Sequence, residues 1–213
     1  MRTFLLMVGL AGALGMAGTA QQTPSPAELA RRIQTRYNAV TDFTADFTQT
    51  YKYELMRQTS VERGDLKVKK PSRMRWTYTA PTRKEFVADG SMFYQHFPRD
   101  KVVQITPLPK AGDAPLALLF LAGRGDLTRD FTPAMPTTQP PGEWQLLLTP
   151  NKKQEDYSTL TLIVRRDTLD LSGLIMVDEN GTQTFLFTKF QANRGLKDAD
   201  FVFVTPRGTE IIK

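Results

Sequence analysis

The chain has 213 residues, with one histidine and no cysteine, and 28 Lys and Arg against 22 Asp and Glu give it a formal net charge of +6 at pH 7. This composition excludes disulfides and the usual histidine- or cysteine-based metal sites, so the fold must depend on its core. A positive charge this modest also argues against nucleic acid as a partner.

The first twenty residues have the three parts of a secretory signal peptide: Met1-Arg2, an apolar run from Phe4 to Met16, and small residues at Gly18 and Ala20. The apolar run is too short for a comfortable membrane span. We therefore expect residues 1–20 to be removed after Ala20 and residues 21–213 to form a single exported domain. Because no cysteine follows that junction, we expect no lipid anchor.

A helix is predicted to start at Ser25, where Ser is the cap, Pro26 takes the first helical position and Glu28 closes a capping box. Apolar residues then recur every three or four positions, at Leu29, Ile33, Tyr37 and Val40. This spacing indicates an amphipathic helix of about four turns that lies on an apolar surface.

Strict alternation of apolar and polar residues predicts a curved antiparallel sheet in the next sixty residues. Asp89-Gly90 is a strong signal for a two-residue hairpin turn. The six expected strands are Phe43–Tyr53, Met56–Lys70, Arg73–Thr79, Phe86–Ala88, Met92–Tyr94 and Lys101–Ile105.

Lys70 has the same parity as Leu66 and Val68 along the second strand, so the alternation that buries these aliphatic side chains also directs an ammonium group to the apolar face. An ammonium group there must extend to water or find hydrogen-bond acceptors. Its neighbours Met74 and Trp76 are large enough either to fill a core or to line a hollow, and the sequence does not choose between these.

Seven basic residues and no acidic residue lie between Lys67 and Lys84. Alternation explains most of them as the solvated outer face of a strand. The alternative is a patch that meets an acidic partner or anionic lipid headgroups.

The region from Thr106 to Gly142 is rich in proline. Within it, Pro115–Ala122 predicts a two-turn helix that is apolar on nearly every side, which is either a buried plug or the cover of a hydrophobic cavity. Thr132–Gly142 is interpreted as an extended surface loop. Five further strands bring the total to eleven: Glu143–Thr149, Ser158–Arg166, Leu171–Asp178, Thr182–Gln191 and Phe201–Val204.

Nothing in the sequence supports catalysis. His96 is the single histidine, the chain has no G-x-S-x-G elbow, and the paired carboxylates fall at predicted turns. We interpret His96 as structural or exposed, and we predict neither an enzyme nor a cofactor.

Taken together, short motifs spread over nearly the whole mature chain make it resemble the LolA family, the periplasmic carrier proteins of outer-membrane lipoproteins. They are Phe43–Gln49, Gly64–Pro71, Arg75-Trp76, Asp89-Gly90 with Tyr94 and Pro98, Pro115 with Leu118-Leu119, and Phe201–Gly208.

The resemblance implies a mainly β fold, an unclosed antiparallel β-barrel of about eleven strands covered by short helices, with a hydrophobic cavity for acyl chains. It also implies that Lys70, at a position that is usually Arg in the family, contacts the lid. Candidates for the cavity wall or lid are Phe43, Phe47, Val68, Met74, Trp76, Tyr78, Phe86, Tyr94, Leu118 and Leu121.

The implied function is that of a periplasmic chaperone, expected to be monomeric, that carries acylated lipoproteins to an outer-membrane receptor. They would come from an ATP-driven release complex of the inner membrane. Two alternatives stay open: a carrier of envelope lipid or glycolipid, and a lipoprotein-sensing domain of the same fold.

Overall fold

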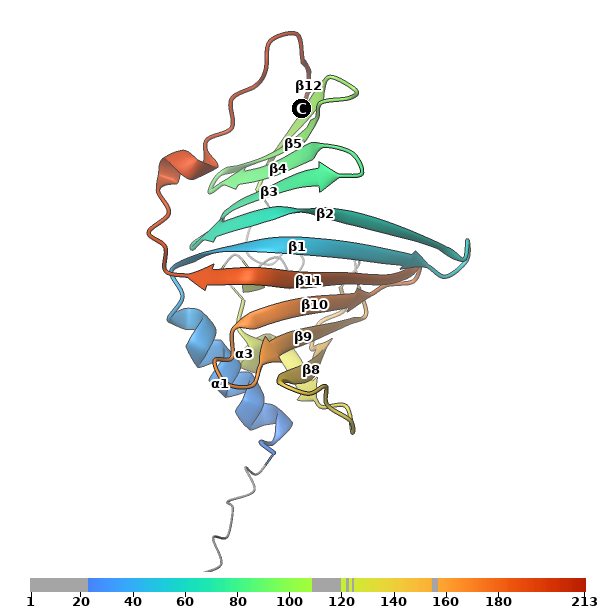
Figure 1. The fold of residues 1–213 in the computed structure, drawn as a ribbon, viewed down its shortest axis with the longest axis vertical. Coiled ribbons are helices and arrows are strands. Elements are labelled where there is room, and N and C mark those ends of the chain that lie inside the picture. Colours follow the sequence, from blue (N-terminus) through green and yellow to red (C-terminus); the bar gives the residue numbers. More distant parts are fainter. Residues whose placement is uncertain (1–22, 109–119, 122, 124, 155–156) are drawn as a thin grey trace, which may run out of the picture.

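The computed structural model describes residues 23–108, 120–121, 123, 125–154 and 157–213. Helix α1 (Pro26–Asn38) begins where the sequence predicts, and the Ser25 side chain accepts a hydrogen bond of 3.2 Å from the backbone N–H of Glu28. Its buried side chains include Leu29, Ile33 and Tyr37, which confirms the predicted apolar face. The helix crosses one half of the sheet, near β8 and β9 (Figure 1).

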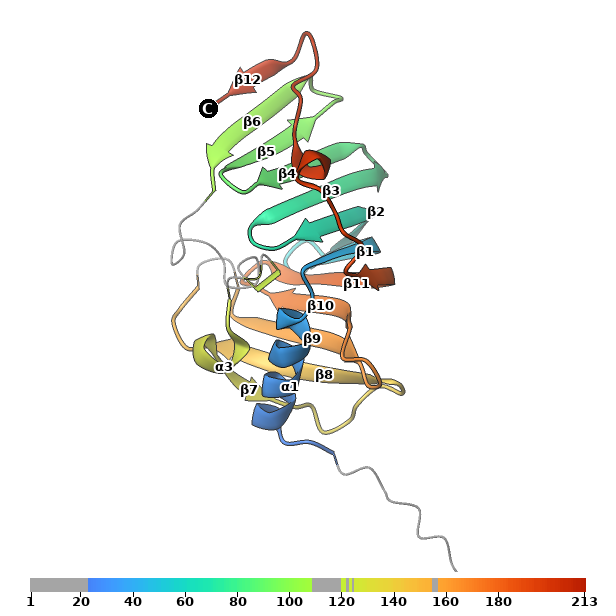
Figure 2. The ribbon, with the colours of Figure 1, turned by 90° about the vertical axis from the view of Figure 1, so that its left-hand side faces the viewer.

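Twelve strands form one open sheet in the order β12-β6-β5-β4-β3-β2-β1-β11-β10-β9-β8-β7 (Figures 1 and 2). All neighbouring strands are antiparallel except β12 and β6, which are parallel. The bounds are β1 (Asp42–Tyr53), β2 (Gln58–Lys69), β3 (Arg73–Ala80), β4 (Lys84–Asp89), β5 (Met92–Phe97), β6 (Val102–Pro107), β7 (Phe131–Ala134), β8 (Glu143–Pro150), β9 (Thr159–Arg165), β10 (Leu171–Val177), β11 (Gly181–Ala192) and β12 (Glu210–Ile212).

The structure has the predicted mainly β, unclosed architecture but differs from the expected eleven strands at both edges of the sheet. Strand β7 overlaps the start of the predicted loop Thr132–Gly142, and Pro133 is tolerated there because edge strands have one side without ladder hydrogen bonds. Strand β12 was also not expected. Short helices are α3 (Leu127–Asp130) and the 3-10 helix η1 (Asp198–Phe201), and Phe120 and Leu121 are helical. The rest of the predicted helix Pro115–Ala122 lies outside the described residues.

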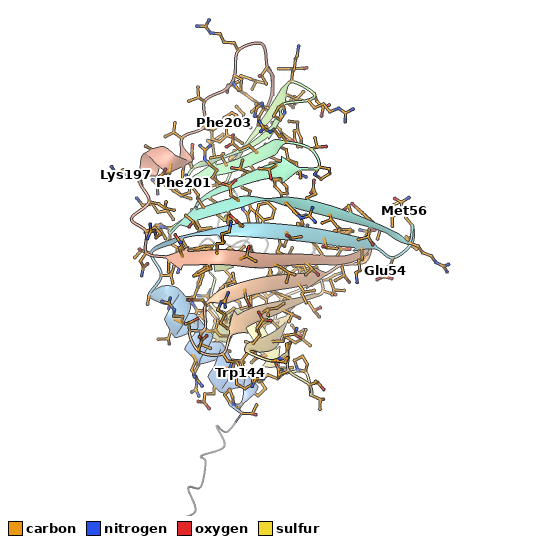
Figure 3. The ribbon with its side chains drawn as sticks, viewed as in Figure 1. Glu54, Met56, Trp144, Lys197, Phe201 and Phe203 are labelled. Carbon is orange, nitrogen blue, oxygen red and sulfur yellow. The ribbon has the colours of Figure 1, made fainter. Side chains whose placement is uncertain are left out.

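The predicted strand Phe201–Val204 is wrong. Residues 193–204, here called the strap, leave β11 and run past β1 to β5 before the chain reaches β12 (Figure 2). Figure 3 labels Phe201 and Phe203 on the strap. Phe201 is fully buried, and Phe203 stacks on Tyr94, with ring centroids 5.1 Å apart. The predicted alternation of apolar residues is therefore present, but the carbonyl groups of this segment accept hydrogen bonds from a side chain and not from a neighbouring strand. Arg75 donates to the carbonyl oxygens of Asp200 and Val202, at 2.8 and 2.7 Å.

The strap also accounts for the basic cluster on β2 and β3. Asp198 pairs with Lys69 at 2.7 Å and with Arg73 at 3.2 Å, and Asp200 lies 3.6 Å from Lys67. These cations therefore meet carboxylates of the same chain.

Candidate functional site

A cavity of about 280 Å³ lies on the inner face of the sheet, the face that carries Met74, Trp76 and Tyr78. Apart from Gln183 and two tyrosine hydroxyls, its described lining is aliphatic, aromatic or thioether. The described lining residues are Met74, Trp76, Tyr78, Phe86, Ala88, Phe93, Leu108, Leu121, Tyr157, Leu174, Met176, Gln183 and Phe185.

Strand register brings the wall of this cavity together. Trp76 lies opposite Phe86, and Met74 lies opposite Ala88, which in turn lies opposite Phe93. Directly opposed residues of antiparallel strands point to the same face, so each alternation adds a row to one apolar wall. The aromatic rings contact one another edge-on, with centroids 5.4 Å apart for Tyr78 and Phe86.

Below this wall, Phe47 packs where β2 has no side chain. Its ring lies 5.1 Å from that of Trp76 and 4.9 Å from that of Tyr78. A Cβ atom on Gly64 would lie 2.9 Å from the Phe47 ring and 2.0 Å from the Thr77 carbonyl oxygen. The glycine of the Gly64-Asp65 motif is therefore needed for close packing under the cavity.

Leu121 covers the cavity, and Tyr37 of α1 holds it there. The buried Tyr37 hydroxyl donates a hydrogen bond of 2.8 Å to the Leu121 carbonyl oxygen, and its ring stacks on Phe120 at 4.3 Å. Burial raises the pKa of Tyr37 above its ordinary value, so the hydroxyl keeps the proton that it donates.

Lys70 meets the same elements from the end of β2. Its ammonium group donates a hydrogen bond to the Tyr37 carbonyl oxygen and lies 3.7 Å from the centroid of the Tyr37 ring. A Cβ atom on Gly123 would lie 2.3 Å from Lys70 Cδ, so the lysine stem fills the space beside that glycine. Burial, together with the nearby Arg36 guanidinium, lowers the pKa of Lys70 to about 8. The ammonium group that the sequence directed inward thus finds its acceptor on α1.

The structure places the predicted site residues in four settings. The cavity is lined by Met74, Trp76, Tyr78, Phe86 and Leu121. The core on the inner face, outside the described lining, holds Phe43, Phe47 and Val68. Tyr94 instead packs against Phe203 of the strap, on the opposite face, and donates to Asp89. Leu118 lies outside the described residues.

Sequence reasoning missed the wall contributed by the second half of the chain and the role of Tyr37. Phe185 alternates with exposed Leu186 on β11, and its ring lies 5.3 Å from that of Trp76. Phe185, Leu174 and Met176 could have been found from the sequence, because they occupy alternate positions on the same face of β10 and β11, two strands that pair with each other. Tyr37 was recognised as apolar, but nothing in the sequence indicated where its hydroxyl points.

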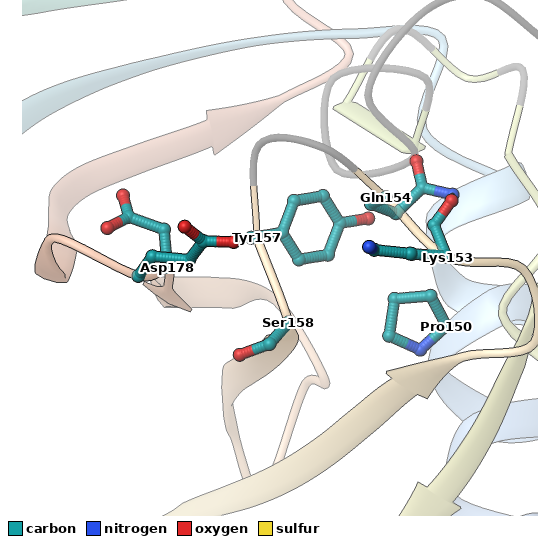
Figure 4. A pocket seen from close by; sticks show the side chains of 7 residues that line it. Pro150, Lys153, Gln154, Tyr157, Ser158 and Asp178 are labelled. Atoms are coloured by element: carbon teal, nitrogen blue, oxygen red, sulfur yellow. The ribbon is translucent and has the colours of Figure 1, made fainter.

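A second, polar pocket of about 260 Å³ adjoins the first at Tyr157, which lines both. The Tyr157 ring lies between Asp178 on one side and Lys153 and Gln154 on the other (Figure 4). Within the part of the chain that the structure describes, no three carboxylate or imidazole groups are placed to hold a metal ion. None of the described helices has the length and hydropathy needed to cross a membrane.

Comparison with known proteins identifies the family of this chain. Residues 38–204 match the family model described as outer membrane lipoprotein carrier protein LolA. The outer-membrane lipoprotein carrier protein of Chromohalobacter salexigens is 27% identical over 100% of this chain and 99% of its own. That of Ralstonia nicotianae is 31% identical over 74% of this chain and 72% of its own. An uncharacterised conserved protein from Thermus thermophilus shares the fold, with a TM-score of 0.56 and 12% identity over 86% of this chain and 98% of its own.

Proposed function

Because the chain belongs to the outer-membrane lipoprotein carrier family LolA, whose members are carriers and not enzymes, we propose that it is a periplasmic chaperone for lipoproteins. Its apolar cavity binds the acyl chains of the cargo. It receives them from an ATP-driven inner-membrane complex and delivers them to an outer-membrane receptor.

The single observation that supports this proposal most is the cavity beneath Leu121. Its wall of aromatic, aliphatic and methionine side chains suits hydrocarbon, whereas a small polar metabolite would find few partners there. Hydrocarbon gains ~0.8 kcal/mol per methylene on leaving water. Several long chains therefore need such a shelter to cross an aqueous space.

The same free-energy estimate predicts that the cavity binds acyl chains only weakly compared with a membrane. A lipid bilayer is already apolar, so moving acyl chains from it into the cavity gains little free energy. Loading must be driven from outside, as by an ATP-driven complex, and unloading requires a receptor with a better pocket.

The cavity must also grow on loading. Its volume of about 280 Å³ lies just below the range of ~300–1,000 Å³ that is usual for small ligands. Several acyl chains need more room, so Leu121 and the chain around it have to move away from the sheet. We regard Tyr37 and Lys70 as the groups that hold this lid over an empty cavity.

Release of lipoproteins from spheroplasts tests the proposal. The purified protein is incubated with spheroplasts, and soluble complexes are searched for acylated lipoproteins. Ala88→Phe, which puts a ring into the cavity, should reduce the yield of complex at least tenfold, whereas Ala134→Phe, the same change at an exposed end of β7, should not. Equal yields from both variants would contradict the assignment of the cavity, as would a wild-type protein that releases nothing.

Mass spectrometry of the extracted ligand separates the proposal from its alternative. A triacylated or diacylated peptide supports lipoprotein carriage. Glycolipid or phospholipid alone would make the protein a carrier of envelope lipid that uses the same cavity. This measurement also covers the case in which Ala88→Phe fails to fold.

A further inference from the structure

The turn that joins β1 and β2 is unusually apolar for its position. Residues 54–57, here called the fingertip, end the hairpin that extends farthest beyond the edge of the sheet in Figure 3. Leu55 is 88% exposed and Met56 is 60% exposed. Single exposed apolar side chains are common, but two large ones together at the end of one projection are typical of an interaction site.

The hairpin that carries these side chains is braced close to its tip. The backbone N–H of Glu54 donates to the Asn180 carbonyl oxygen at 2.9 Å, and the Tyr51 hydroxyl donates to Asp178 at 2.9 Å. The rings of Tyr51 and Tyr53 lie 4.2 Å apart. The fingertip is therefore held out from the sheet by hydrogen bonds to the turn between β10 and β11.

Basic side chains flank the fingertip and are placed to meet anionic headgroups. Lys52, Arg57 and Arg63 are exposed on the hairpin. Of the hairpin's acidic residues near the fingertip, Glu62 is paired with Lys84 at 2.8 Å, which leaves Glu54. On the neighbouring turn Glu179 is exposed and Asp178 accepts hydrogen bonds from Tyr51 and from the turn's own backbone. At the fingertip itself the exposed charges are mixed, with Lys52 and Arg57 beside Glu54 and Glu179, and Arg63 adds a further exposed cation farther along β2.

The shape of the fingertip favours lipid over protein. A stable protein interface buries roughly 800 Å² on each partner around a central apolar cluster, and a single turn offers far less. A bilayer interface needs only a few apolar side chains that enter the boundary between headgroups and acyl chains, with basic residues among the anionic headgroups. Leu55 and Met56, flanked by Lys52 and Arg57, match that arrangement.

From these observations we propose that the fingertip is a membrane-docking site, which inserts Leu55 and Met56 into the interface of an anionic lipid bilayer. Met176 and Gln183 line the cavity and pair with each other near the β10–β11 turn that braces the hairpin. Docking therefore brings this end of the cavity close to the lipid. The contact is weak and reversible, because two side chains and a few cations carry it.

Vesicle flotation tests the docking site without any cargo, so its result is independent of whether the protein carries lipoproteins. With vesicles of phosphatidylethanolamine and phosphatidylglycerol at low salt, the wild-type protein should float. The double variant Leu55→Ser with Met56→Ser should partition at least tenfold less. Val204→Ser, the same kind of change at a residue that is 77% exposed on the strap, should leave partitioning unchanged. Raising the salt or omitting phosphatidylglycerol should weaken the binding.

A second readout locates the contact. Since the chain has no cysteine, Met56→Cys and Val204→Cys each give a single labelling site for an environment-sensitive dye. Dye at position 56 should brighten and shift to shorter wavelength on addition of anionic vesicles, whereas dye at position 204 should not.

The proposal is overturned if the wild-type protein ignores these vesicles, or if the double serine variant partitions as well as the wild type. Loss of binding of that variant to a purified membrane-protein complex, with no vesicle binding by the wild type, would assign the fingertip to a protein partner instead.

Discussion

Replacing Tyr37 by Phe removes one oxygen atom from the lid contact and leaves the rest. The stack on Phe120 and the ring beneath Lys70 are both retained, so the change isolates the hydrogen bond to the Leu121 carbonyl oxygen. The site is buried, and the variant leaves that carbonyl without its partner, at a cost of about 1.5 kcal/mol. Since 1.4 kcal/mol is a factor of ten, the open lid should become about tenfold more populated.

Amide hydrogen exchange measures this population directly, because the Gly123 N–H donates to the Phe120 carbonyl oxygen at 2.8 Å and exchanges only when that turn opens. In Tyr37→Phe its exchange should be about tenfold faster. Tyr94→Phe makes the same chemical change on the opposite face, where the hydroxyl bonds to Asp89, and should leave Gly123 unaffected. An unchanged rate in Tyr37→Phe, or an equal increase in both variants, would refute the assignment of Tyr37 as the lid's anchor.

Three further changes test the neighbouring contacts. Lys70→Leu should favour the open or permanently loaded form, seen as loss of lid protection in hydrogen exchange. It should also remove a pH dependence: the folded pKa of Lys70 is about 8 against 10.5 for an ordinary lysine, so between these values the unfolded chain holds a proton that the folded chain has released. Wild-type stability should therefore rise with pH relative to the variant across that window and not below it, and parallel urea midpoints from pH 7 to 10 would contradict this. Gly123→Ala strains a residue with φ of +72° and displaces the Lys70 stem, so lid exchange should speed up about 5- to 30-fold, a cost of about 1–2 kcal/mol; wild-type exchange would show that the stem moves freely. Arg75→Leu takes both donors from the strap, breaks the ion pair with Glu85 as well, and should lower the free energy of unfolding by about 2 kcal/mol in urea titrations, with Arg63→Leu as an exposed control; equal losses in the two would count against a specific role for Arg75.

Local signals in the sequence predicted the fold well where a strand or helix depends on its own residues. The cap at Ser25, the alternation from Phe43 onward and the rows at Met74, Trp76 and Tyr78 all have their predicted structure. Strand β12 was missed because three residues at the chain's end carry no alternation to detect, and it exists only because β6 offers a free edge.

The errors at the site have one physical origin, which is the relation between neighbouring strands. Phe86 and Tyr94 were both chosen as cavity residues, yet across the Asp89-Gly90 hairpin Phe86 lies opposite Gln95 and Tyr94 lies opposite Val87. Opposed residues share a face, so Tyr94 could not accompany Phe86, and Phe93 was the better choice. Applying the hairpin register to the sequence would have revealed this.

Other features depend on distant partners and left no local signal. The cluster from Lys67 to Arg75 meets Asp198 and Asp200, more than one hundred residues later. The hydroxyl of Tyr37 meets a carbonyl whose position is set by the lid. Such pairings are fixed by the three-dimensional arrangement, which periodicity alone does not encode.

The strap gives the molecule an order of assembly. A polypeptide is made from its N-terminus, so β2 and β3 precede the strap by more than one hundred residues. The carboxylates that neutralise Lys67, Lys69 and Arg73, and the carbonyls that accept hydrogen bonds from Arg75, all belong to the strap. Until the strap has been made and has folded across β2 and β3, these cations have no counter-charges from it, so this outer face is completed only after β1 to β11 have been made.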